Sequence, residues 1–354
     1  MDSLTQIVLG GAVAAAIAPA PHRRAALLAG AMLGTLPDLD ALPLALLTDD
    51  PVARMTWHRS ASHSLFVLPL LGWAIWALFR RSGGRVAESP LRWFWAIQLA
   101  LVTHPLLDAF TVYGTQLWWP LPMRSVMWSS VFIIDPLYTI WLLAACIAAW
   151  WLRERIAAQR VLLAGLVLSS AYLAWSLLAK VAVDREAGRA LAAIGLADAP
   201  RFSVPMPFNT VLWRVVAMTP QGFVEGERSL LADSGPMVFR GYRSNLEALR
   251  AAQGIAAVQR LDWFNHGFQK AQVRDGVLVL SDLRMGAEPD YTFNFAVAER
   301  DGNAWRAIPP EQLRWPWQAT RRLTAMWERI WTQPALAQAA AGNPVATPAA
   351  SASK

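Results

Sequence analysis

Seven side chains that can bind a metal ion stand at the ends of apolar stretches of this sequence. They comprise three of the five histidines and four aspartates: Asp38, Asp40, His58, His63, His104, Asp108 and Asp135. An ionisable group inside an apolar membrane-spanning helix costs at least about 2.5–3.5 kcal/mol near the bilayer centre. Each of these residues therefore needs a physical reason to be there.

Two pairs have a spacing that brings both side chains to one side. His104 and Asp108, in "THPLLDAF", are four residues apart, so on a helix they project from the same face, although Pro105 can distort that turn. Asp38 and Asp40, in "LPDLD", are two residues apart and follow a proline that disfavours a continuing helix. In an extended segment, residues two apart face the same way.

The third pair, His58 and His63 in "TWHRSASHSLF", is five residues apart and misses the ideal helical spacing. We expect a loop or the first turn of a helix to bring both rings inward. Imidazole together with carboxylate suits zinc, manganese or iron. Seven candidates exceed the needs of one tetrahedral ion, and paired metals are typical of phosphoester hydrolysis. The pattern predicts one or two divalent ions and does not distinguish among these metals.

Composition indicates a membrane protein. Of the 354 residues, 55% are hydrophobic and only 16% are charged, against about 25% charged in typical soluble domains. Nineteen tryptophans agree, because indole rings favour the membrane–water boundary. The net charge of +7 is read as a signal of topology. No basic helix with interleaved aromatic residues appears, so nucleic-acid binding is not expected.

Six apolar segments are candidates for helices that cross the membrane, which takes about 20 apolar residues each. They are residues 4–20, 25–47, 62–79, 93–110, 131–152 and 161–179. The first is not read as a signal peptide, because "MDSLTQ" lacks the expected positive charge. Nine arginines follow segments one, three and five, and three follow segments two and four. The positive-inside rule then predicts an outer N-terminus, and a periplasmic location for everything after segment six.

The sequence divides into three parts. Residues 1–184 are predicted to form the transmembrane helical domain that carries the metal site. Residues 185–331 contain β-branched and aromatic runs such as "GVLVLSDLRM" and "YTFNFAVAER", which predict a small β-rich extracytoplasmic domain. Residues 332–354 are rich in Ala, Pro and Ser and are predicted to be disordered.

Several motifs resemble a known family. "MDSLTQIVLGGAV", "GTLPDLD", "HRSASHSL", "THPLLDAFTVYGTQLWWP" and "FIIDPLYT" are similar to segments of the YdjM-type family of bacterial inner-membrane proteins, which are described as metal-dependent hydrolases. The resemblance continues through "PFNTVLWRVV", "WFNHGF" and "DLRMGAEPDYTFNF", and so covers about residues 1–300.

The resemblance implies metal ligation by His58, His63, His104 and Asp108, with Asp38 and Asp40 as a conspicuous acidic pair. This sequence departs from the family at two positions. Gln6 stands where many members have a histidine, and an amide is a weak, neutral ligand. Ser60 replaces the usual glycine, which changes the geometry of the loop.

These observations predict a metal-dependent hydrolase at the outer leaflet of the inner membrane. Metal ions held by the predicted ligands would lower the pKa of bound water toward about 7. These ligands are His58, His63, His104, Asp108 and Asp38. Asp135 or Asp40 would act as general base or would orient a ligand. Arg59 would steady an anionic group, or would anchor a lipid headgroup. A lipid or lipid-linked phosphoester is the expected substrate, and the sequence indicates no particular protein partner.

Simpler interpretations exist for single residues. Asp38 can be a turn residue, and Asp135 a charge favoured by a helix N-terminus. Arg284 in "DLRMG" is expected at a surface turn. The competing function is non-enzymatic, either a metal-ion transporter or a module that binds a partner. A transporter should line a path through the midplane with polar groups, and the sixth segment offers only Ser169, Ser170, Tyr172 and Ser176.

Overall fold

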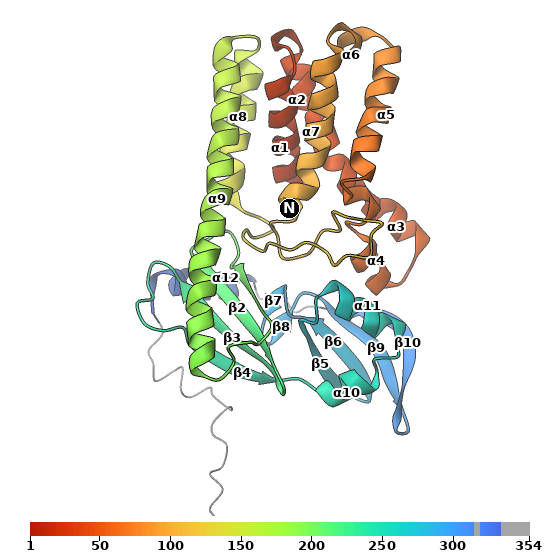
Figure 1. Ribbon diagram of the computed structural model, residues 1–354, viewed down its shortest axis with the longest axis vertical. Helices are drawn as coiled ribbons and strands as arrows, with labels where there is room; N and C mark the ends of the chain where they lie inside the picture. Colours follow the sequence, from red (N-terminus) through yellow and green to blue (C-terminus); the bar gives the residue numbers. More distant parts are fainter. Residues whose placement is uncertain (315–318, 334–354) are drawn as a thin grey trace, which may run out of the picture.

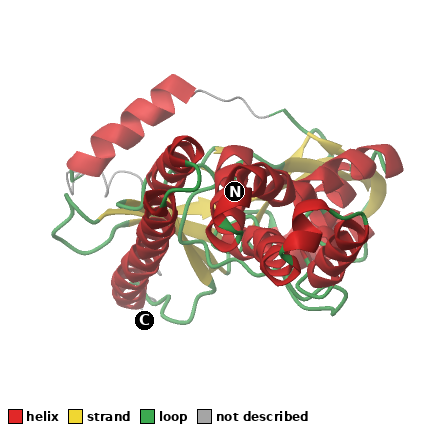
Figure 2. Cartoon of the chain, turned by 90° about the horizontal axis from the view of Figure 1, so that it is seen from above, coloured by secondary structure: helices red, strands yellow, loops and turns green. Residues whose placement is uncertain are grey.

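The computed structural model describes residues 1–314 and 319–333. Figure 1 shows a bundle of helices along the long axis of the molecule, with a β-rich half below it. One helix, α9 (Ile156–Ala193), runs through both halves. Viewed from above, the bundle helices stand end-on over the strands (Figure 2). The predicted disordered tail, 332–354, lies outside the described residues from 334 onward.

Long apolar helices joined by short ones make up the bundle. The long helices are α1 (Ser3–Ile17), α2 (Arg23–Thr35), α5 (Val67–Arg81), α7 (Pro90–Asp108), α8 (Pro136–Leu152) and the first part of α9. The short ones are η1 (Ala20–His22), η2 (Leu36–Asp40), α3 (Ala41–Leu47), α4 (Pro51–Trp57), η3 (Ala61–His63) and α6 (Gly84–Glu88). Each of the six predicted apolar segments overlaps one of the long helices.

Two helical stretches of the described chain are long and apolar enough to cross a membrane. They are Ala20–Leu47 and Ile156–Ala193. A third is added if Pro51–His63 and Val67–Arg81, which are bent by 55° relative to each other, count as one span. Helices α1 and α8 are apolar but shorter. By length and composition, two or three spans are therefore supported where the sequence predicts six.

Glycines bring α1 and α2 into backbone contact. A Cβ atom at Gly10 would collide with the carbonyl oxygen of Gly30, and one at Gly34 would collide with the carbonyl oxygen of Gln6. Small residues at a helix crossing allow two backbones to approach this closely. The contact fixes the end of α2, from which the chain turns into η2 with the first acidic pair of the predicted site.

The β-rich half contains two four-stranded antiparallel sheets and a two-stranded ribbon. The first sheet, in the order β1-β2-β3-β4, consists of β1 (Arg201–Pro205), β2 (Leu212–Thr219), β3 (Gly222–Ser229) and β4 (Phe239–Arg243). The second, in the order β10-β9-β6-β5, consists of β5 (Gln269–Arg274), β6 (Val277–Asp282), β9 (Asn294–Asp301) and β10 (Ala304–Gln312). The ribbon is β7 (Gly286–Ala287) with β8 (Asp290–Tyr291), and the helices are α10 (Leu246–Ala251), α11 (Ala256–Phe264) and α12 (Ala319–Trp331). The prediction of a separate domain built from β-sheets is confirmed.

The lower part of α9 packs on the first sheet. Ala179 and Leu191 of the helix share a buried core with Trp213 and Val215 of β2. These two strand residues are two positions apart and so face the same side of the sheet. The helix therefore continues past residue 184, where the sequence suggests a domain boundary, and ends at Ala193.

A Gly30→Leu substitution is expected to destabilise the helical half. A side chain there meets the carbonyl oxygen of Gly10 and the Cβ atom of Ala14. Such overpacking typically costs about 1–3 kcal/mol. Thermal unfolding in detergent, followed by circular dichroism, should show a lower melting temperature. Gly254→Ala is the control, because nothing lies within 4 Å of a Cβ atom at that position. Equal melting temperatures for the two variants would contradict the packing described.

Candidate metal centre

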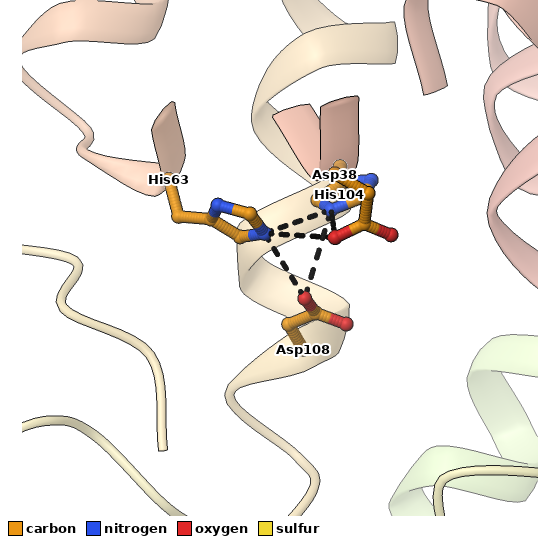
Figure 3. Close-up of side chains that lie close together, drawn as sticks. All are labelled: Asp38, His63, His104 and Asp108. Carbon is orange, nitrogen blue, oxygen red and sulfur yellow. Dashed lines mark hydrogen bonds and ion pairs between the residues drawn. The ribbon is translucent and has the colours of Figure 1, made fainter. Parts of the chain in front are cut away.

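Four potential metal ligands converge where the helical bundle meets the β-rich half. Asp38 comes from η2, His63 from η3, and His104 and Asp108 from the last turns of α7. One ligand atom from each lies within 4.8 Å of all the others. Figure 3 shows the four side chains pointing toward one another from three segments of the chain. The α7 helix continues through Pro105, so His104 and Asp108 do share a face.

The His104 ring is fixed in one tautomer. Its Nδ1 atom lies 2.6 Å from the carbonyl oxygen of Gly34, and a carbonyl oxygen can only accept a hydrogen bond. Nδ1 therefore carries the proton, and in the neutral ring Nε2 presents a lone pair to the cluster. Hydrogen bonding at one ring nitrogen commonly orients the other as a metal ligand.

The same reasoning applies to His63. The Ser62 hydroxyl donates to the Asp40 carboxylate, so its oxygen accepts from the His63 Nδ1 atom at 2.9 Å. The His63 Nε2 atom then also presents a lone pair, 3.0 Å from that of His104. Two lone pairs at this distance repel each other unless a proton or a cation lies between them.

The carboxylates of Asp38 and Asp108 each direct one oxygen atom toward the two imidazole nitrogens. Asp38 Oδ1 lies 3.3 Å from His63 Nε2 and 3.4 Å from His104 Nε2. Asp108 Oδ2 lies 3.3 Å and 3.6 Å from the same two nitrogens. Both oxygens are buried and accept no hydrogen bond of good geometry, although the Arg59 guanidinium forms an ion pair with Asp108 Oδ2. Buried polar atoms are normally satisfied, so these two oxygens beside two imidazoles fit a divalent cation with two nitrogen and two oxygen ligands.

Asp108 is held from several sides. The Arg59 Nε atom lies 3.1 Å from its Oδ2 atom, while the Gln6 amide donates to Oδ1 at 3.0 Å. The amino group of Met1 also donates to Oδ1. Arg59 is only 5% exposed, and its guanidinium donates to the Thr111 hydroxyl at 3.3 Å. The Arg59 guanidinium and the Met1 amino group therefore both lie against the Asp108 carboxylate, whereas the Asp38 carboxylate lies mainly against the two imidazoles.

Residues 1–183 match the family model of the YdjM inner membrane protein. The chain belongs to this family. The matched region contains all four clustered residues of this YdjM chain, and most of the β-rich half lies beyond it. No curated protein and no solved structure matches the chain.

Three residues expected at the site, His58, Asp40 and Asp135, lie outside the cluster. His58 pairs with Asp40, at 2.7 Å between Nδ1 and Oδ1, and Asp40 also accepts from the backbone N–H of Arg59 at 3.2 Å. Asp135 caps α8: its carboxylate accepts from the first-turn amide of Leu137 at 3.1 Å and from the Tyr172 hydroxyl at 2.9 Å. Asp40 thus organises the loop that carries the histidines, and Asp135 acts as a helix cap.

Sequence reasoning missed two groups that orient the imidazoles. Ser62 lies inside the quoted "HRSASH" stretch, and its position next to His63 was an available signal. The Gly34 carbonyl has no side-chain signature, because only the packing of α2 against α7 brings it to His104.

His63→Ala and His104→Ala are expected to abolish stoichiometric metal binding, since each removes one of two nitrogen ligands. His58→Ala should retain the ion, because its ring pairs with Asp40 outside the cluster. Elemental analysis of purified full-length protein after metal loading measures this. His266→Ala, in the β-rich half, is the matched histidine control. Equal metal content in all four variants would show that these imidazoles hold no ion.

Proposed function

We propose that this protein is a metal-dependent hydrolase that acts at the outer leaflet of the inner membrane on a lipid or lipid-linked phosphoester. The observation that carries the proposal is the cluster of four potential metal ligands, in which two carboxylate oxygens accept no hydrogen bond. Such a set at the end of an apolar bundle supports chemistry at the bilayer surface.

Asp38, His63, His104 and Asp108 would hold one divalent ion. Two imidazole nitrogens and two carboxylate oxygens suit zinc, and manganese and iron accept the same donors. When bound, such an ion lowers the pKa of water toward about 7 and stabilises negative charge on a phosphoryl oxygen.

Asp38 is the residue best placed to face the reactants. Its side chain is 21% exposed, whereas the side chains of His63, His104 and Asp108 are fully buried. The Asp38 Oδ1 atom would bind the ion, and the second carboxylate oxygen, Oδ2, would accept the proton of an attacking water. Arg59, beside Asp108, would attract the anionic phosphoester. The Asp40 carboxylate would keep Ser62 oriented toward His63.

Exposed apolar side chains beside the site support a lipid substrate. Leu42, Leu46 and Leu47 of α3, which directly follows Asp40, are 65%, 89% and 76% exposed. Trp118 and Trp119, in the loop after α7, are 38% and 39% exposed. Exposed apolar patches mark interaction surfaces, and tryptophan favours the membrane interface. A lipid could therefore reach the cluster without leaving the bilayer surface.

The interior of the bundle argues against a transporter. Its core is filled by apolar side chains, including Ala12, Leu101, Leu142 and Leu162. A transport path should carry polar groups near the bilayer midplane. The clustered ligands lie instead on η2, η3 and the last turns of α7.

The proposal includes six membrane-crossing helices, an outer N-terminus and a periplasmic β-rich domain, on the strength of the arginine distribution. Alkaline phosphatase fused after residue 333 should therefore be active, because this enzyme folds only outside the cytoplasm. A green fluorescent protein fused at the same position should be dark after export. Bright fluorescence with an inactive phosphatase would reverse the orientation.

Purified protein loaded with zinc or manganese is expected to hydrolyse phospholipids or polyprenyl phosphates in mixed micelles. Chelation should abolish release of the product, and metal should restore it. His104→Ala should lower the rate by at least about 10–100-fold, because the loss of a residue that merely supports a ligand already has an effect of this size. His266→Ala is the control. Stoichiometric metal with no lipid hydrolysis, but with metal flux in proteoliposomes, would favour the transporter.

A further inference from the structure

Arg284 is buried inside the β-rich half, contrary to the surface turn expected from "DLRMG". The residue is 1% exposed. Its Nη2 and Nε atoms donate to the Asp282 carboxylate at 2.7 Å and 3.0 Å, and its guanidinium carbon lies 4.8 Å from the ring centre of Phe264. A buried guanidinium is tolerated when its donors are matched in this two-pronged way.

One donor of Arg284 points out of the β-rich half. Its Nη1 atom donates to the carbonyl oxygen of Tyr113 at 2.9 Å, in the loop that follows α7 and Asp108. The neighbouring Gly114 has φ of 99°, and a Cβ atom there would lie 2.5 Å from the Ser125 hydroxyl oxygen. Glycine at this position therefore leaves room for Ser125, and a Cβ atom there would lie 3.4 Å from the Arg284 Nη1 atom.

The Tyr113 ring contacts two residues next to the candidate metal centre. Its ring centre lies 4.9 Å from the guanidinium carbon of Arg59 and 5.8 Å from the ring centre of His58. Burial raises the pKa of the Tyr113 phenol, so the hydroxyl stays protonated and donates to the Met55 carbonyl oxygen at 2.8 Å. Both the backbone carbonyl and the hydroxyl of Tyr113 are thus hydrogen-bonded, and the Arg59 guanidinium is packed between the Tyr113 ring and Asp108.

A shared apolar core reinforces the contact. Val52 and Met55 of α4, which precedes the histidine loop, are buried in one cluster with Phe264 and Leu283 of the β-rich half. Arg260 of α11 also donates to the Thr56 hydroxyl of α4. The β-rich half therefore contacts both the helix that precedes the histidine loop and the loop that follows Asp108.

We propose that Arg284 is a positioning residue of the metal centre. It fixes the Tyr113 backbone, so that the Tyr113 ring directs Arg59 toward Asp108. The β-rich half is then a part of the site, although most of it lies outside the family match. This inference rests on metal binding by the four clustered residues and deepens the proposed function.

Cobalt binding to the full-length protein in detergent tests the inference. Arg284→Gln should weaken cobalt affinity about 10–100-fold, as loss of a supporting residue typically does, and should change the visible absorption spectrum of the bound cobalt. Arg284→Lys should behave similarly, because one ammonium cannot hold Asp282 and the Tyr113 carbonyl together. Arg300→Gln is the matched control: Arg300 lies 5.2 Å from the Trp305 ring centre and is exposed. It should leave affinity and spectrum unchanged.

A second variant separates positioning from a general loss of folding. Tyr113→Leu leaves the Arg284–Asp282 pair intact and should reproduce the altered spectrum. If both residues act through Arg59, adding Arg284→Gln to Tyr113→Leu should change the affinity less than about twofold. Wild-type affinity and spectrum in Arg284→Gln or Tyr113→Leu would overturn the inference and leave the proposed function intact. Absence of cobalt binding in the wild type would overturn both.

Discussion

The Nε2 atoms of His63 and His104 lie 3.0 Å apart, beside two carboxylate oxygens that accept no hydrogen bond. In the neutral rings both nitrogens present lone pairs, and the arrangement of the candidate metal centre depends on balancing the repulsion among these atoms. In a buried environment of low dielectric, such atoms remain together only around a positive charge. The Gly34 carbonyl and the Ser62 hydroxyl occupy the outer ring nitrogens, which leaves the inner ones free to bind. Both inner nitrogens are therefore oriented toward the position that a cation would occupy.

This arrangement follows from how the helices pack. Glycines at the crossing of α1 and α2 bring these two helices into backbone contact, and the Gly34 carbonyl at the end of α2 reaches His104 of α7. The α7 helix supplies His104 and Asp108 from one face, and Gln6 of α1 donates to Asp108. The packing of α1, α2 and α7 together thus positions His104 and Asp108, and the backbone contact between α1 and α2 leaves these two helices little freedom to slide.

The sequence indicated the helical segments and the β-rich half, since apolar runs and alternating strands have local signatures. It also singled out ionisable residues at the ends of apolar runs, and the four-residue spacing of His104 and Asp108 has its expected geometric consequence. The role of Asp135 as a helix cap rather than a metal ligand also has a local signature, because Asp followed by Pro136 is typical of a helix start. The pairing of His58 with Asp40 was not, because it joins residues 18 positions apart through a turn that only the fold defines.

The buried Arg284 shows a further limit, since a charged residue at a strand end has the same local signature whether it is exposed or docked. Its burial depends on Asp282 nearby and on the Tyr113 carbonyl 171 positions away. Leaving one donor of a buried guanidinium unmatched costs about 1–3 kcal/mol or more. Stability of the β-rich half therefore depends on the loop after α7 being in place, as the loop depends on that half. Coupling between two sites is reciprocal, so an ion bound by Asp108 that ordered this loop would also stabilise the docking of the β-rich half.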